Sequence, residues 1–284
     1  GFGDHVVGGY LEADGGLGQG FWWGGLVVGV SGPYQPGDDP RSIDWRVTAR
    51  STTAYTKLFR EERERPVLVA VDLRSNMHFA TQGCFKSVNA SRAAALLSWA
   101  AHHRGDRLGG LVFGDTTHRE LKPRLGRRAA LRFVHELVEH PDWTRSDPEL
   151  ANPEALTQAM SALRRVARPG SLVVVISDFV GFSRAAQSYL SSVARHNEVL
   201  AVFLNDPLER ELPPPGRYRL VSPNDELAID TYAAPARRDY AHAFEKRLHE
   251  LETFCQRYGV HLMPLSTDDD PVSALQTALG RRTH

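Results

Sequence analysis

Two aspartates that directly end hydrophobic runs are the strongest candidates for chemistry in this sequence. Asp72 ends the run VLVAVD (67–72), and Asp178 ends SLVVVISD (171–178). Ligands of open α/β sheets bind at the carboxyl ends of the strands, so both carboxylates are expected at one edge. Two carboxylates at one edge repel each other unless a cation or a hydrogen-bond donor lies between them. The alternative is that each aspartate only caps the loop or helix that follows it.

Catalytic sequence templates are otherwise missing. The chain contains no GxxxxGK[ST] phosphate loop, no GxSxG nucleophile elbow, no HExxH and no paired CxxC. The glycine-rich GGLGQG (15–20) does not match the dinucleotide-binding fingerprint. We therefore expect no enzymatic activity, and a metal-dependent hydrolase that uses the paired acids is kept only as a remote alternative.

The composition narrows the classes of partner and compartment. Lys plus Arg and Asp plus Glu both number 34, so the formal net charge is zero and nucleic acid is not an expected partner. The two cysteines, Cys84 and Cys255, lack metal-ligand spacing and favour a reducing compartment. The apolar stretch Phe21 to Val30 is about half the ~20 residues that a membrane helix needs. We expect a cytoplasmic protein without membrane insertion, and the role of Phe21 to Val30 stays open.

The elements that must position the two acids alternate between strands and helices. Apolar runs of strand length alternate with segments of helical periodicity, which is typical of a mostly parallel sheet with helices on both faces. The predicted strands are 67–72, 107–113, 171–178, 198–206 and 260–265. The predicted helices carry the stripes Ala90 to Ala101, Leu131 to Val138, Leu156 to Val166 after an Asn152-Pro153 start, Tyr240 to Tyr258 with Gly259 as the stop, and Ala274 to Ala278 after Asp270-Pro271.

We divide the chain into two parts. Residues 1–64 are predicted to form a glycine-rich β appendage with YTKLF (55–59) as its clearest strand, and residues 65–284 an α/β domain with a hairpin insertion near 216–232. The appendage contains the block GDDPRSIDW (37–45), in which charged residues alternate around Ile43 and Trp45. This block is interpreted as a structural clasp or, alternatively, a binding surface. Its candidate residues are Gly37, Asp38, Asp39, Arg41, Asp44 and Trp45.

These blocks also carry a family resemblance. The segment DLRSNM (72–77) occupies the place where von Willebrand A domains have an Asp-x-Ser-x-Ser metal-binding loop, and ISDF (176–179) resembles the strand with their second acid. From about Tyr34 to Thr267 the chain resembles the bacterial domain-of-unknown-function family 58. The blocks that carry this likeness are 34–51, 60–65, 102–115 and 195–216. Before Tyr34 the sequence departs from the family pattern.

The resemblance implies a fold, a site and a partner. The fold is von Willebrand A-like, and the ligand-binding residues of a degenerate metal site are Asp72, Arg74, Ser75, Asn76 and Asp178. Such proteins are often encoded beside a MoxR-type AAA+ ATPase and are thought to help assemble or mature other complexes. The resemblance thus implies a non-catalytic protein-interaction module whose partners are a MoxR-type ATPase and its client.

Metal binding is the main alternative for this site. In the metal-binding pattern both serine hydroxyls are ligands, whereas this chain has Arg74 and Asn76 at those positions. A guanidinium has five donors and no acceptor, so Arg74 cannot bind Mg²⁺. We expect no metal and no cofactor, with Arg74 either bridging the two acids or facing solvent beside them. The alternative is a divalent-metal-dependent ligand binder in which Asp72, Asn76 and Asp178 hold Mg²⁺.

Overall fold

The structure, a computed structural model, describes most of the α/β region and two short strands before it. The described residues are 31–33, 55–57, 65–78, 80, 83–143, 151–210, 217–222, 225–230 and 234–280. The chain divides into two units, residues 64–278 and residues 1–63 with 279–284. In the smaller unit, β1 (Ser31–Pro33) pairs antiparallel with β2 (Tyr55–Lys57). The block 37–45 and the segment Phe21 to Val30 lie outside the described residues.

A six-stranded sheet forms the centre of the larger unit. Its strands are β3 (Pro66–Asp72), β4 (Arg107–Phe113), β5 (His118–Arg124), β6 (Leu172–Ser177), β7 (Glu198–Asn205) and β10 (His261–Ser266). Their order is β10-β7-β6-β3-β4-β5, and every pair is parallel except β4 with β5. The strand order reverses between β3 and β6, which is where open α/β sheets bind ligands. The predicted mostly parallel α/β sheet is confirmed.

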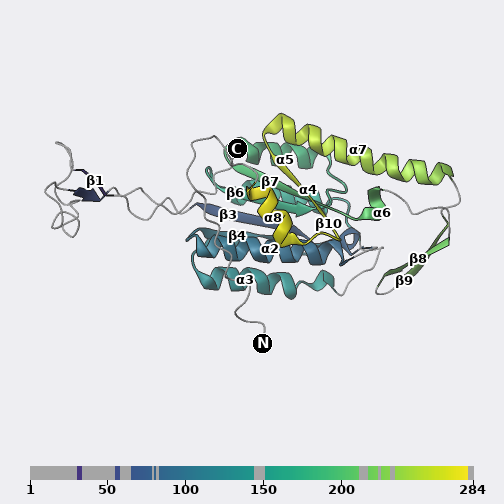
Figure 1. Cartoon of the computed structure of the whole chain (residues 1–284), viewed down its shortest axis with the longest axis horizontal. Coiled ribbons are helices and arrows are strands. Elements are labelled where there is room, and N and C mark those ends of the chain that lie inside the picture. Colours follow the sequence, from purple (N-terminus) through teal and green to yellow (C-terminus); the bar gives the residue numbers. More distant parts are fainter. Residues whose placement is uncertain are drawn as a thin grey trace. The chain divides into compact units, whose positions relative to one another are not determined.

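Helices cover both faces of this sheet. The helices are α2 (Lys86–His103), α3 (Arg127–Val138), α4 (Ala155–Val166), α5 (Arg184–Ala194), α6 (Pro207–Arg210), α7 (Ala234–Tyr258) and α8 (Pro271–Gly280). Two short 3₁₀ turns are η2 (Ser75–Met77) and η3 (Pro141–Trp143). As Figure 1 shows, α2 and α3 lie on one side of the sheet, and α4, α5 and α7 on the other. No helix in the part of the chain described here is long and apolar enough to cross a bilayer.

The core follows from the sequence pattern of strands and helices. Val67, Val69 and Val71 alternate with Leu68 and Ala70 along β3, and all five are buried because both faces of the strand are covered. A core cluster joins β3, β6 and β7 to α4, α5 and α7. Continuous apolar strands are thus fixed in the centre of the sheet, and their carboxyl ends form one edge.

A hairpin and the outer strands complete the sheet structures. β8 (Arg217–Ser222) and β9 (Asp225–Asp230) pair antiparallel in the region where a hairpin insertion is predicted. β5 and β10 are the outermost strands of the six-stranded sheet. Each contains a proline, Pro123 in β5 and Pro264 in β10. Proline has no amide hydrogen and cannot donate to the hydrogen-bond ladder of a central strand. It is tolerated in an outer strand, where one side of the strand has no neighbour.

The region after β4 differs from the prediction. The stretch LKPRLGRRAA (121–130) forms the end of β5 and the start of α3, and β5 is not among the predicted strands. Only Leu121 of β5 is buried, so this outer strand lacks the apolar pattern that identifies central strands. α3 also turns a different face inward: Phe133 and Leu137 are buried, whereas Leu131 and Val138 are 46% and 65% exposed.

Helix boundaries also differ at one position. The structure starts α4 at Ala155, two residues after the predicted start at Pro153. The amide of Glu154 donates to Asn152 Oδ1 (3.0 Å), so Asn152 forms a turn before the helix and does not cap it. By contrast, α8 begins at Pro271 as expected, and Asp270 accepts from the Ser273 amide (3.1 Å).

Candidate functional site

The carboxyl ends of β3 and β6 bring Asp72 and Asp178 together. The two strands are neighbours, with Val71 opposite Ile176, so each aspartate leaves the sheet at the same edge. Both side chains are fully buried. An ionised carboxylate at such depth is costly unless it is paired or accepts several hydrogen bonds. The question is therefore what neutralises this pair.

Arg74 neutralises Asp72. Its Nε lies 3.0 Å from Asp72 Oδ1 and its Nη2 lies 2.7 Å from Oδ2, the two-point geometry in which arginine binds carboxylates most strongly. Nη2 is also 3.7 Å from Asp178 Oδ1, and Nη1 donates to the carbonyl of Val180 (3.1 Å). Arg74 is only 3% exposed. Of the two orientations that were expected, the side chain takes the inward one, between the acids.

A second cation, Lys86, neutralises Asp178. Lys86 is the first residue of α2, and its Nζ lies 2.7 Å from Asp178 Oδ2 and 2.9 Å from Glu209 Oε1. The side chain is 1% exposed. Sequence reasoning missed both Lys86 and Glu209. One signal was available, because Lys86 lies four residues before Ala90 and so continues the buried stripe of its helix back to the strand-end acids.

Asn76 and Ser177 fill further acceptor positions of the two acids. The Nδ2 of Asn76 donates to both oxygens of Asp178, at 2.7 and 2.8 Å. The Ser177 hydroxyl donates to Asp72 Oδ2 (2.7 Å) and accepts from the amide of Phe179 (2.9 Å). Asn76 was considered as an oxygen ligand, but it presents its amide nitrogen to the site.

Ser75 contributes through its backbone. Its amide donates to Asp115 Oδ2 (2.7 Å), and Asp115 Oδ1 accepts from the amide of Asn152 (3.0 Å). Asp115 lies two residues after the end of β4, and it ties two loops together. Ser75 is thus placed at the edge of the site, whereas Asp72, Arg74, Asn76 and Asp178 meet inside it.

The electrostatics keep Asp178, Lys86 and Arg74 charged. Burial by itself would raise the pKa of Asp178, but the Lys86 ammonium and the Arg74 guanidinium outweigh burial and hold that pKa at about 2. Burial would lower the pKa of Lys86, whereas Asp178 and Glu209 raise it above its ordinary value. Burial would likewise lower the pKa of Arg74, and Asp72 raises it. We call these five groups, Asp72, Arg74, Lys86, Asp178 and Glu209, the ion cluster.

The ion cluster does not fit a divalent metal. A hard cation needs about six oxygen ligands, counting waters, with free lone pairs. Both oxygens of Asp72 and both oxygens of Asp178 already accept hydrogen bonds from cationic or amide donors. Among the described side chains, no group of three or more His, Cys, Asp or Glu residues could hold a metal ion. The positive charge at this edge is therefore supplied by the chain itself.

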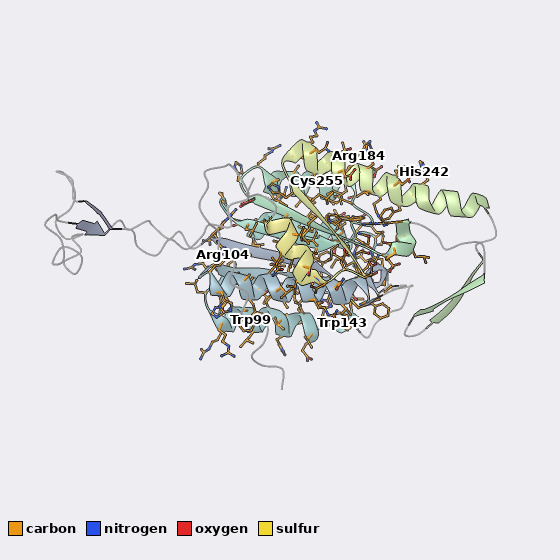
Figure 2. All side chains as sticks on the ribbon, in the orientation of Figure 1. Trp99, Arg104, Trp143, Arg184, His242 and Cys255 are labelled. Carbon is orange, nitrogen blue, oxygen red and sulfur yellow. The ribbon has the colours of Figure 1, made fainter. Side chains whose placement is uncertain are left out.

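A cavity of about 360 Å³ opens beside the ion cluster. It lies between the loop after β6 and the helix α7, and its lining includes Phe179, Gly181, Phe182, Arg247, Glu250 and Leu251. In Figure 2, Arg184 at the start of α5 lies beside α7, between His242 and Cys255 of that helix.

The loop that forms one wall of this cavity is held in an uncommon conformation. Phe179 has φ of 53°, and no other described non-glycine residue has a positive φ. Such a conformation costs about 1–3 kcal/mol and persists only where the surroundings fix it. Here Asp178 accepts from the Val180 amide (3.1 Å) and Arg74 donates to its carbonyl, so the ion cluster fixes the loop.

Comparisons with known proteins identify a family, a bacterial relative and two solved structures to which this chain is similar. A family model described as "Protein of unknown function DUF58" matches residues 31–250. The uncharacterized protein Rv1480 of Mycobacterium tuberculosis is 32% identical over 250 residues, which cover 87% of this chain and 76% of that protein. Among solved structures, the conserved hypothetical protein BatB of Bacteroides thetaiotaomicron is 14% identical with a TM-score of 0.47, over 75% of this chain and 95% of BatB. A von Willebrand factor type A structure from Catenulispora acidiphila is 8% identical with a TM-score of 0.39, over 81% and 43% of the two chains.

Proposed function

The chain belongs to the DUF58 family of proteins of unknown function, and on that premise we propose that it is a non-catalytic protein-interaction module. The observation that carries the proposal is the ion cluster. At the sheet edge where a ligand would bind, Arg74 and Lys86 supply the positive charge. A ligand site built this way needs no metal. Its buried ion pairs fix the loop after β6, so that this loop presents one constant surface to a partner.

The state of the two acids argues against hydrolysis. A general acid or base works best when its pKa lies near the working pH and when it can reach the substrate proton. Asp178 is fully buried and has a pKa of about 2, because Lys86 and Arg74 outweigh the effect of burial. Asp72 is equally buried and is held at two points by Arg74. Neither carboxylate is placed to exchange a proton with a substrate, which supports a binding role.

The proposed partner is a MoxR-type AAA+ ATPase, in the assembly or maturation of other protein complexes. This part of the proposal rests on the resemblance of the sequence blocks between Tyr34 and Thr267. The client protein would be delivered by, or shared with, that ATPase.

The test is a binding measurement between the purified full chain and a MoxR-type ATPase from the same organism. Binding is measured without nucleotide, with ADP and with a non-hydrolysable ATP analogue, each in the presence of Mg²⁺ to support the ATPase. We expect saturable binding in at least one nucleotide state. Its absence in all three states would reject the ATPase as partner. Parallel assays of the chain alone with generic ester, phosphate and peptide substrates are expected to show no turnover.

A further inference from the structure

We infer that the cavity between the loop after β6 and α7 binds a carboxylate of a partner polypeptide through the guanidinium of Arg247. The inference rests on the proposed function, because it names the chemistry that a partner would bring to this edge of the sheet. The occupant is an acidic side chain, or a C-terminal carboxylate, that stands beside an apolar side chain of the partner.

Arg247 is the cationic group among the described residues that line this cavity. None of its donors makes a hydrogen bond within the described structure, and its Nε is buried without a partner. The carboxylate nearest to it, Glu209 Oε1, lies 3.7 Å from Nη2, which is too far for a good hydrogen bond. That oxygen already accepts from Lys86 at 2.9 Å. A guanidinium offers five donors in a planar fork that matches a carboxylate, so Arg247 lacks the ligand that its geometry suits best.

Arg247 is also accessible and well oriented. Its side chain is 25% exposed, and its guanidinium lies 5.5 Å from the ring centre of Phe244 and 5.9 Å from that of Phe203. These two aromatic rings hold the flat group in place. A partner carboxylate could therefore reach Arg247 without first breaking a strong internal ion pair.

The rest of the cavity selects for an apolar neighbour of that carboxylate. Phe182 and Leu251 line it together with Arg247. Phe182 is fixed by edge-to-face contacts with Phe179 (5.4 Å) and Phe254 (5.1 Å). At about 360 Å³ the cavity is at the small end of the range for ligand sites and suits one or two side chains. Glu250 also lines the cavity and is exposed, so it repels carboxylates that approach from its side and favours entry next to Arg247.

The test uses a small probe and does not require the ATPase. Isotope-labelled full chain is titrated with 3-phenylpropanoate and, separately, with its neutral analogue 3-phenylpropanamide, and the amide signals of Gly181 and Phe182 are followed by NMR. We expect saturable shifts with the carboxylate and at least tenfold weaker binding of the amide, a difference of about 1.4 kcal/mol. Arg247→Gln should weaken carboxylate binding by about tenfold or more, and Arg247→Lys by less, because lysine keeps the charge but loses the fork.

Arg257→Gln is the matched control, since Arg257 lies on the same helix, is exposed, and does not line the cavity. It should leave the affinity unchanged. The inference is overturned if the wild-type chain shows no saturable shifts, if the amide binds as well as the carboxylate, or if Arg247→Gln binds like the wild type. Because no ATPase is present, these results are separate from the partner test: a chain that binds the ATPase but not the probe rejects this site alone.

Discussion

Replacing Lys86 with methionine removes one charge of the ion cluster while keeping a long, unbranched side chain. In the wild type, Lys86 Nζ contacts Asp178 and Glu209 at 2.7 and 2.9 Å. Removing one partner of a buried ion pair typically costs about 3–5 kcal/mol, because the other charge is left uncompensated. Arg74 and Asn76 still face Asp178 in the variant, so we expect a loss near the lower end, ~3 kcal/mol at pH 7.

The pH dependence of this loss gives a second, independent check. The pKa of Asp178 is about 2 in the folded wild type against an ordinary 3.8, because Lys86 and Arg74 outweigh burial. A lowered pKa means that the ionised carboxylate contributes stability above pH 3.8 and loses it as the pH falls through 2, an amount of about 2 kcal/mol. In Lys86→Met the ammonium is gone, and protonation of Asp178 relieves its uncompensated charge. The difference in unfolding free energy between variant and wild type should therefore shrink between pH 5 and pH 3.

The assay is urea unfolding of both proteins, followed by far-ultraviolet circular dichroism at pH 7, 5, 4 and 3. Lys246→Met is the control, since Lys246 is exposed on α7 and its loss should change stability by no more than about 0.5 kcal/mol. A Lys86→Met protein that unfolds within 0.5 kcal/mol of the wild type at pH 7 would refute the structural role of Lys86. A gap that stays constant with pH would refute the assignment of the effect to Asp178.

Three further predictions follow from the same structure. Titration calorimetry with Mg²⁺ and Mn²⁺ should give no saturable heat, because the acceptors of Asp72 are occupied; micromolar binding that disappears in Asp72→Ala would contradict this. Phe133→Ala should lower the unfolding free energy by about 3–5 kcal/mol and Leu131→Ala by at most about 0.5 kcal/mol, because Phe133 is buried and Leu131 is exposed. Urea unfolding measures both losses, and a larger loss for Leu131→Ala would mean that α3 is wrongly oriented. Gly110→Ala should unfold or precipitate the protein, because a Cβ there would clash with the carbonyl oxygen of Val69. A soluble variant with wild-type thermal unfolding would argue against the β3–β4 register.

The central strands and the meeting of the two acids could be predicted from the sequence. Val67 to Asp72 is continuous and apolar because both faces of β3 are covered, and such runs are distinctive. The strand-end position then fixes where the carboxylates of Asp72 and Asp178 emerge. A guanidinium has donors and no acceptor, so Arg74 could be assigned a charge-pairing role in place of a metal-binding role. This assignment needs no knowledge of the fold.

Other parts depend on contacts that sequence spacing does not reveal. Lys86 and Glu209 are 123 residues apart, and the four-residue helix α6 that carries Glu209 has no periodic pattern of its own. β5 has a single buried residue, so the rule that identifies central strands does not apply to it. On α3, two apolar stripes compete, and the stripe with the larger side chain, Phe133, is the one that packs inward.

The prolines of the two outer strands bear on how the protein behaves at high concentration. An outer strand normally exposes a row of free amide and carbonyl groups, onto which a strand of another molecule can add, and this is a common start of aggregation. In the described sheet, each outer strand contains a proline, Pro123 in β5 and Pro264 in β10, which has no amide hydrogen to donate to an added strand. The charged residues of β5 add repulsion at the same edge. Crowded molecules, including those still folding, are thus hindered from joining sheet to sheet, and recognition of other chains is left to side-chain surfaces such as the cavity beside α7.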